Sequence, residues 1–112
     1  MSSVKLNKMI EKLQLVNLVP EVSTDEIEIS SPEINRPALQ LAGYFEHFAS
    51  ERVQIIGYVE YTYLKSLDRD VKMANYEQFL SSDIPCVIYS TRTEPDEDMI
   101  ELAKKYHKPL LS

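Results

Sequence analysis

Four residues that follow two apolar runs are the best candidates for binding a small ligand: Gly57, Tyr58, Thr91 and Arg92. Ligands of a parallel α/β sheet bind beyond the carboxyl ends of its strands, which is where these residues fall if the apolar runs are strands. The Thr91 hydroxyl and the Arg92 guanidinium are suited to a carboxylate or a phosphate. The alternative is that Arg92 pairs with a neighbouring carboxylate and stabilises its own loop.

Three further residues, Asn35, Arg36 and Tyr44, are candidates for holding a loop or for meeting a partner. Arg36 precedes Pro37, which favours an extended backbone just before a helix, so its side chain can clamp that loop. Tyr44 belongs to a set of tyrosines that can serve either as core or as an exposed aromatic surface for a protein partner. The other members are Tyr58, Tyr61 and Tyr63.

The histidines and the cysteine form no catalytic or metal-binding pattern. His47 and His107 are sixty positions apart, whereas zinc ligands usually occur in pairs a few residues apart. We expect His47 on a helix surface and His107 at a helix end, where a cation interacts well with the helix dipole. Cys86 falls in a predicted buried strand, where a thiol is usually inert. We therefore predict no catalytic residue, no metal site and no cofactor in this chain.

The glycines, Gly43 and Gly57, are too few for two common nucleotide-binding motifs. A Walker A loop needs two glycines five positions apart before Lys-Ser/Thr, and a dinucleotide fingerprint needs three, because the backbone must approach phosphates closely. The sequence also lacks the Gly-x-Ser-x-Gly turn of serine hydrolases, because neither glycine has a serine at the required spacing. The chain alone is therefore neither a P-loop kinase nor a classical NAD-binding domain.

Apolar runs alternate with helical patterns in the second half of the chain. The predicted strands are 53–56, 86–89 and 110–111. The helical patterns cover 59–67, 73–80 and 95–106. Acidic residues open the last helix and lysines close it, which suits the helix dipole but makes its N-terminus a poor phosphate site. The alternation implies β-α-β units and a mainly parallel sheet flanked by helices, that is, a single α/β domain.

The first half of the chain has shorter patterns. The expected elements are a helix near 3–14, an extended piece at 15–16 and a strand at 24–30. Pro37 is well placed as the first residue of a further helix, which would carry Leu41, Phe45 and Phe48 on one face. Gly43 leaves two alternatives: the helix ends near it, or the glycine allows another group to pack close against the helix.

Length and composition indicate one globular domain over residues 1–112. The chain has 12 Lys and Arg against 18 Asp and Glu, a net charge of −6, and this argues against nucleic acid or an anionic membrane as the main partner. No apolar run approaches the roughly 18 residues of a membrane span, and the N-terminus is no signal peptide. A single cysteine fits a reducing cytoplasm. Because the chain ends within the apolar segment 109–111, we expect it to be a domain of a longer protein.

The stretch Ile34–Phe45, INRPALQLAGYF, followed by ERVQIIG at 51–57, resembles the N-terminal domain of the bacterial HPr kinase/phosphorylase family. Later segments look like the continuation of the same domain in the same order. They are PCVI at 85–88, TR at 91–92, EP at 94–95 and PLL at 109–111. The resemblance covers the chain from about residue 4 to the end, and Asn35–Phe45 is its most specific part.

The resemblance implies an α/β domain similar in fold to the UDP-binding N-terminal domains of the Mur ligases. It implies that the full-length protein, a hexamer, phosphorylates a serine of the phosphocarrier HPr with ATP and Mg²⁺ and removes that phosphate again. The kinase chemistry of the family lies in a C-terminal P-loop domain, which this chain lacks. The chain departs from the family at Ala38 and Thr93, where glycine is common, so close backbone approach to a ligand is lost there.

The leading hypothesis is a non-catalytic regulatory or assembly domain of such a kinase, in carbon catabolite regulation of the sugar phosphotransferase system. It would act in the cytoplasm through protein contacts with its own C-terminal kinase domain, with further copies of itself or with HPr. The alternative is a stand-alone module of the same fold that binds a nucleotide or a phosphorylated metabolite. Its binding residues would be Gly57, Tyr58, Thr91 and Arg92.

Overall fold

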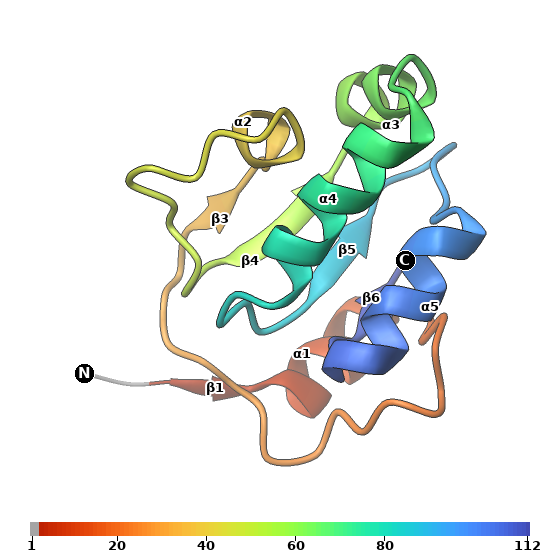
Figure 1. Ribbon diagram of the computed structural model, residues 1–112. Coiled ribbons are helices and arrows are strands. Elements are labelled where there is room, and N and C mark those ends of the chain that lie inside the picture. Colours follow the sequence, from red (N-terminus) through yellow and green to blue (C-terminus); the bar gives the residue numbers. More distant parts are fainter. Residues whose placement is uncertain (1–2) are drawn as a thin grey trace.

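A four-stranded parallel sheet, with strand order β3-β4-β5-β6, forms the centre of the molecule (Figure 1). The structure is a computed structural model that describes residues 3–112. The strands of the sheet are β3 (Ile34–Asn35), β4 (Val53–Ile56), β5 (Val87–Tyr89) and β6 (Leu110–Leu111). Each neighbouring pair is parallel. The predicted α/β class, with β-α-β units and a mainly parallel sheet, is confirmed.

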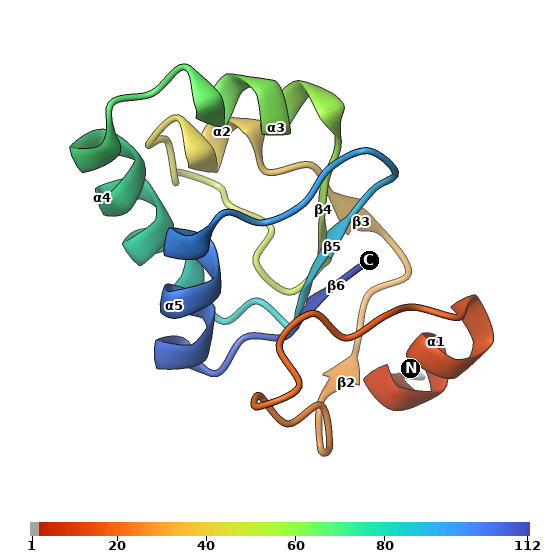
Figure 2. The same cartoon turned by 90° about the vertical axis from the view of Figure 1, so that its right-hand side faces the viewer.

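Four helices cover one face of this sheet (Figure 2). They are α2 (Ala38–Leu41), α3 (Tyr58–Lys65), α4 (Arg69–Leu80) and α5 (Glu97–Tyr106). The strands lie side by side in chain order, so successive crossovers of one hand place their helices on the same side. The main core lies between this face and the helices. It contains Ile56, Val87 and Leu110 from the strands, with Phe79 and Met99 from the helices.

The opposite face carries one helix, α1 (Leu6–Leu13), next to a two-stranded antiparallel sheet of β1 (Val4–Lys5) and β2 (Glu28–Ile29). A second, smaller apolar cluster lies here. Its buried members are Leu6, Ile29, Val53, Cys86 and Leu111. The chain after α1 closes the β6 edge of the sheet, because Asn17 bridges antiparallel to Leu111 and the Val16 N–H donates to the Ser112 carbonyl at 2.8 Å.

The helix that was predicted to start at Pro37 is shorter than expected. It ends at Leu41, and Gly43 has a φ of +96°, which a helix cannot accommodate. Asn75 lies close against that glycine and donates a hydrogen bond to the Leu41 carbonyl at 2.8 Å, so both alternatives for Gly43 hold. Phe45 and Phe48 therefore belong to a loop, where their rings pack edge to face at 5.8 Å.

Three other predictions need correction. His47 is not on a helix but in the loop after α2, with a φ of +61°. The strand predicted at 24–30 is limited to β2, because Glu26 has a φ of +69° and turns the chain. The helix predicted near 3–14 begins only at Leu6, since Val4–Lys5 pair with β2 as a strand. β3 was not predicted, because its two residues are too few to show a period.

Candidate functional site

The predicted residues Arg36 and Gly57 meet at the carboxyl ends of β3 and β4, and both contact the buried carboxylate of Glu60. Arg36 Nη2 donates to Glu60 Oε1 at 2.8 Å, and the Gly57 N–H donates to the same oxygen at 2.6 Å. A Cβ on Gly57 would lie 2.3 Å from Arg36 Nη2. The guanidinium thus fills the space in front of Gly57. The absence of a side chain at this glycine makes room for Arg36 and not for a ligand.

Asn35, the other predicted residue of β3, belongs to a network of side-chain amides beneath α2. Its Nδ2 donates to Gln54 Oε1 at 2.7 Å and to Gln40 Oε1 at 3.2 Å. Gln54 is fully buried, and its Nε2 donates to the Arg52 carbonyl at 2.8 Å. The Asn35-Arg36 pair therefore joins β3, α2, β4 and α3 through side-chain hydrogen bonds.

The predicted residues Tyr58 and Arg92 are two members of a row in which a cation lies at each end of a pair of aromatic rings. The Arg92 guanidinium lies 5.4 Å from the centre of the Tyr58 ring, and the rings of Tyr58 and Tyr61 are 6.2 Å apart. Lys65 Nζ lies 4.3 Å from the centre of the Tyr61 ring. Tyr58, Tyr61 and Lys65 fall on one side of α3 because their spacing is three and four residues. Thr91 is exposed in the loop before Arg92.

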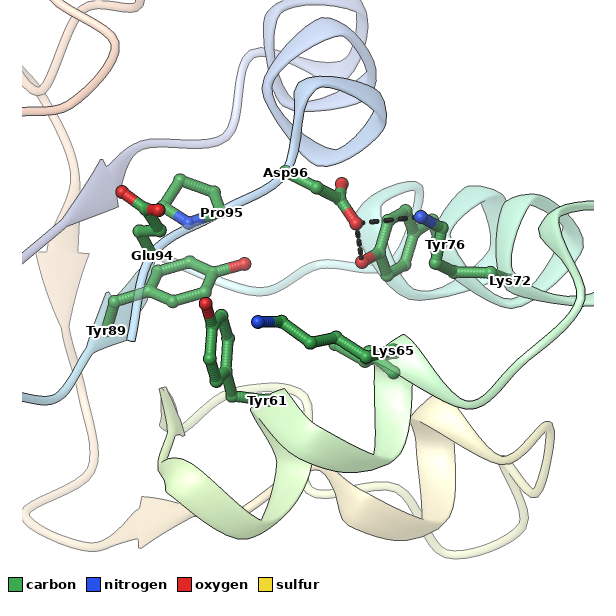
Figure 3. Close-up of a pocket in the computed structure, with 9 residues that line it drawn as sticks. Tyr61, Lys65, Lys72, Tyr76, Tyr89, Glu94, Pro95 and Asp96 are labelled. Carbon is green, nitrogen blue, oxygen red and sulfur yellow. Dashed lines mark hydrogen bonds and ion pairs between the residues drawn. The ribbon is translucent and has the colours of Figure 1, made fainter. Parts of the chain in front are cut away.

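The row leads into a pocket of about 350 Å³ at the carboxyl end of β5 (Figure 3). Its walls come from α3, α4, β5 and the start of α5. The lining residues are Tyr61, Leu64, Lys65, Lys72, Tyr76, Tyr89, Glu94, Pro95 and Asp96. The sequence candidates for ligand binding include none of these residues, because they were chosen directly after the predicted strands, whereas most of the pocket comes from helices. The spacing of Tyr58, Tyr61 and Lys65 on one helix is the signal that could have found the pocket.

Asp96 organises one wall of the pocket. Its Oδ2 accepts hydrogen bonds from Lys72 Nζ and from the Tyr76 hydroxyl, each at 2.8 Å, and its Oδ1 accepts from the Met99 N–H at 2.8 Å as the N-cap of α5. Burial, with the nearby Asp96 charge, raises the pKa of Tyr76 well above its usual value, so the phenol remains a donor. These groups hold α4 against α5, and their polar atoms are already paired.

The remaining sequence candidates lie apart from this pocket. Cys86 is fully buried on the other face of the sheet, where desolvation raises the pKa of its thiol to about 12. His107 ends α5 in a left-handed conformation and His47 is exposed. Within residues 3–112, no three His, Cys, Asp or Glu side chains gather as a metal site would require.

Tyr44 lies on an exposed apolar surface formed by α2 and α3. Its side chain is half exposed, and Val59 is the most exposed member at 68%. The other large apolar side chains there are Leu39, Tyr58 and Tyr63. Several exposed apolar side chains on neighbouring elements are a feature of surfaces that meet another protein. In the described part of the chain, residues 3–112, no helix has the length and hydrophobicity to cross a membrane.

Comparison with known proteins identifies one family. The family model described as "HPr Serine kinase N terminus" matches residues 4–112. The HPr kinase/phosphorylase of Lachnoclostridium phytofermentans is 39% identical over 110 residues, which are 98% of this chain and 36% of that protein. The HPr kinase/phosphorylase of Caldicellulosiruptor bescii is 42% identical over 106 residues, 95% of this chain and 34% of that protein. The chain thus spans about a third of the length of these relatives.

Proposed function

Because the chain belongs to the family of HPr serine kinase N-terminal domains, we propose that it is the regulatory or assembly domain of an HPr kinase/phosphorylase and is not itself catalytic. Its role would be in carbon catabolite regulation of the sugar phosphotransferase system, in the cytoplasm. The observation that carries this proposal is the match over residues 4–112 to only the first third or so of proteins that are named for the kinase activity.

The glycine content supports a non-catalytic role. Gly43 and Gly57 are the only glycines of the chain, so the sequence holds no Walker A loop. Gly57 is also covered by the Arg36 guanidinium, which leaves no room for a phosphate against its backbone. In the longer protein, ATP and Mg²⁺ would therefore be bound by residues outside this domain.

The exposed apolar surface on α2 and α3 supports action through protein contacts. Val59 and Leu39 are more than half exposed there, and Tyr44 and Tyr58 are about half exposed. Aromatic residues are enriched where proteins meet. We propose that this surface contacts the kinase domain or a further copy of the protein, with HPr as a third candidate partner.

A phosphorylation assay tests the first part of the proposal. The purified 112-residue chain is incubated with HPr, ATP and Mg²⁺, and phosphoserine is measured by mass spectrometry. We expect none to form, while the full-length Lachnoclostridium phytofermentans kinase serves as the positive control. Phosphoserine on HPr that depends on this chain alone would overturn the proposal.

A binding assay tests the second part. The chain is titrated into the full-length Lachnoclostridium phytofermentans kinase, and complex formation is followed by sedimentation velocity. We expect Val59→Asp to weaken the complex at least roughly tenfold, because it places a charge in an apolar contact. Val71→Asp is the matched control, since Val71 is about half exposed but lies on α4. Equal affinities for the two variants would exclude this surface.

A further inference from the structure

The hydroxyl of Tyr89 ends in the pocket without a partner. Tyr89 is the last residue of β5 and only 3% exposed, and its hydroxyl points into the pocket (Figure 3). Among residues 3–112 it forms no hydrogen bond, whereas the neighbouring phenol of Tyr76 is bonded to Asp96. The hydroxyl belongs to the small exposed part of Tyr89, because among residues 3–112 the only fully buried side-chain polar atom without a partner is Arg52 Nε. The hydroxyl is therefore open to the pocket and free to bond a ligand or a solvent molecule.

Two further donors face the same space. Figure 3 shows the Tyr61 hydroxyl and the Lys65 ammonium beside Tyr89, with the ammonium directed toward the Tyr61 ring, 4.3 Å from its centre. Burial raises the pKa of Tyr89, and the Tyr61 phenol raises that of Lys65, so both keep their protons in neutral solution. Three donors that line one pocket, one of them charged, suit an oxyanion.

Two carboxylates lie near the pocket and act on its groups, since the Asp96 charge contributes to the raised pKa of Tyr89 and the Glu94 charge to that of Lys65. Asp96 is neutralised by Lys72 at 2.8 Å and also accepts the Tyr76 hydroxyl and the Met99 N–H. The Glu94 carboxylate lies at the rim and points away from the Lys65 ammonium (Figure 3). Among residues 3–112, Lys72 is paired with Asp96 whereas Lys65 forms no ion pair, so the Lys65 ammonium remains available to an anion.

The rest of the lining is apolar and limits the size of a ligand. Leu64, Pro95 and the Tyr61 ring line the same space, whose volume is about 350 Å³. This is near the lower end of the range for small-molecule sites. The pocket can thus hold an anionic group together with a small ring or a short carbon chain.

We propose that this pocket binds a small organic anion, a phosphate ester or a carboxylate, whose oxygens accept hydrogen bonds from Tyr61, Lys65 and Tyr89. The apolar part of the ligand lies against Leu64 and Pro95. This inference goes beyond the proposed function, and it is tested on the 112-residue chain alone, without HPr or a kinase. Either proposal can therefore fail while the other holds.

The experiment is an NMR titration of the ¹⁵N-labelled chain with three probes that share a phenyl ring. Phenyl phosphate and benzoate carry the two anionic groups, and benzyl alcohol is their neutral counterpart. We expect at least one anion to shift the amide resonances around Tyr61, Tyr89 and Pro95 with a dissociation constant of about 1 mM, as suits a fragment. Which anion binds more tightly distinguishes a phosphate ester from a carboxylate as the ligand.

Variants connect the binding to the named donors. Tyr89→Phe removes only the unpartnered hydroxyl, so we expect unchanged thermal stability and binding that is weaker by roughly tenfold or more. Lys65→Gln should weaken binding to a similar extent. Tyr63→Phe is the matched control, since Tyr63 lies on the same helix outside the pocket. The proposal is overturned if neither anion shifts these resonances, if benzyl alcohol binds equally well, or if Tyr89→Phe binds like the control.

Discussion

The buried carboxylate of Glu60 needs an arginine at position 36 and a glycine at position 57, although these two residues are far apart in the sequence. It is the one buried charged side chain among residues 3–112, at 4% exposure. Its Oε1 accepts from both the Arg36 guanidinium and the Gly57 N–H. A buried carboxylate is costly without such partners, so the contact ties the start of α3 to the end of β3.

Replacing Gly57 with alanine should destabilise the protein by about 3 kcal/mol, since it displaces Arg36 from Glu60 and removes a favourable residue at the helix N-cap. The reason is the Cβ, which would lie 2.3 Å from Arg36 Nη2. In an Arg36→Ala background that clash is absent, so the same substitution should cost only about 1 kcal/mol. Urea unfolding of the four proteins of this double-mutant cycle measures the difference. Equal costs in both backgrounds would show that the guanidinium does not occupy this space.

The sequence points to part of this arrangement. Arg36 is predicted to clamp a loop because proline follows it, and Gly57 is predicted at the end of a strand. Their partner Glu60 is not predicted, because one acidic residue in a helix looks like any solvated residue until the fold buries it. Tyr89 is missed for a related reason. Its position at the end of a strand is predictable, but the pocket that its hydroxyl enters is closed by α3 and α4, whose residues come earlier in the chain.

At the level of elements, Asp96 both caps the N-terminus of α5 and holds this helix against α4. Asp96 caps the helix through the Met99 N–H and binds Lys72 and Tyr76 of α4. Local sequence predicts the helix and its acidic first turn, because capping and dipole effects depend on neighbours in the chain. It cannot predict the contacts with α4, which lie twenty or more residues away.

Asp96→Ala should therefore cost more than the loss of a helix cap. We expect a destabilisation of about 2–4 kcal/mol, because the cap is lost and the buried Tyr76 hydroxyl is left without a partner. Glu97→Ala is the control, since Glu97 is exposed in the first turn of the same helix, and it should change stability by less than about 0.5 kcal/mol. Urea unfolding gives both values. A similar, small effect for the two variants would contradict the role of Asp96 between α4 and α5.

A strand or helix is predicted correctly where its apolar pattern is long enough and its ends are marked by residues that interrupt it. The strand predicted at 53–56 matches β4, because four mostly apolar residues are followed by a glycine. The helix predicted from Pro37 ends at Leu41, in agreement with one of the two alternatives for Gly43, although Phe45 and Phe48 keep helical spacing. Their rings reach the core from a loop, since Phe48 packs against Phe79 at 5.9 Å. Apolar spacing alone therefore cannot distinguish a helix from a loop that lies on the core.

At the level of the whole molecule, the two faces of the sheet are buried to different extents. Parallel sheets are usually covered on both sides. Here α2 to α5 lie on one face, and the opposite face has α1 and the β1–β2 pair. Ile34, which is paired with Val53 of that second face, is 48% exposed, and Ile55 and Ile88 are only partly buried. Neighbouring residues of β4 should therefore differ in what they contribute to stability.

Ile55 and Ile56 provide the test, because they are adjacent in one strand and point to opposite faces. Ile56 is fully buried in the main core, so Ile56→Ala should leave a cavity and cost about 3–4 kcal/mol. Ile55 is half-buried beside α1, so Ile55→Ala should cost about 1 kcal/mol. Urea unfolding at one temperature compares the two. Equal losses would mean that the second face is as well covered in solution as the first, by α1 or by another copy of the chain, and a dependence of the Ile55→Ala loss on protein concentration would identify the latter.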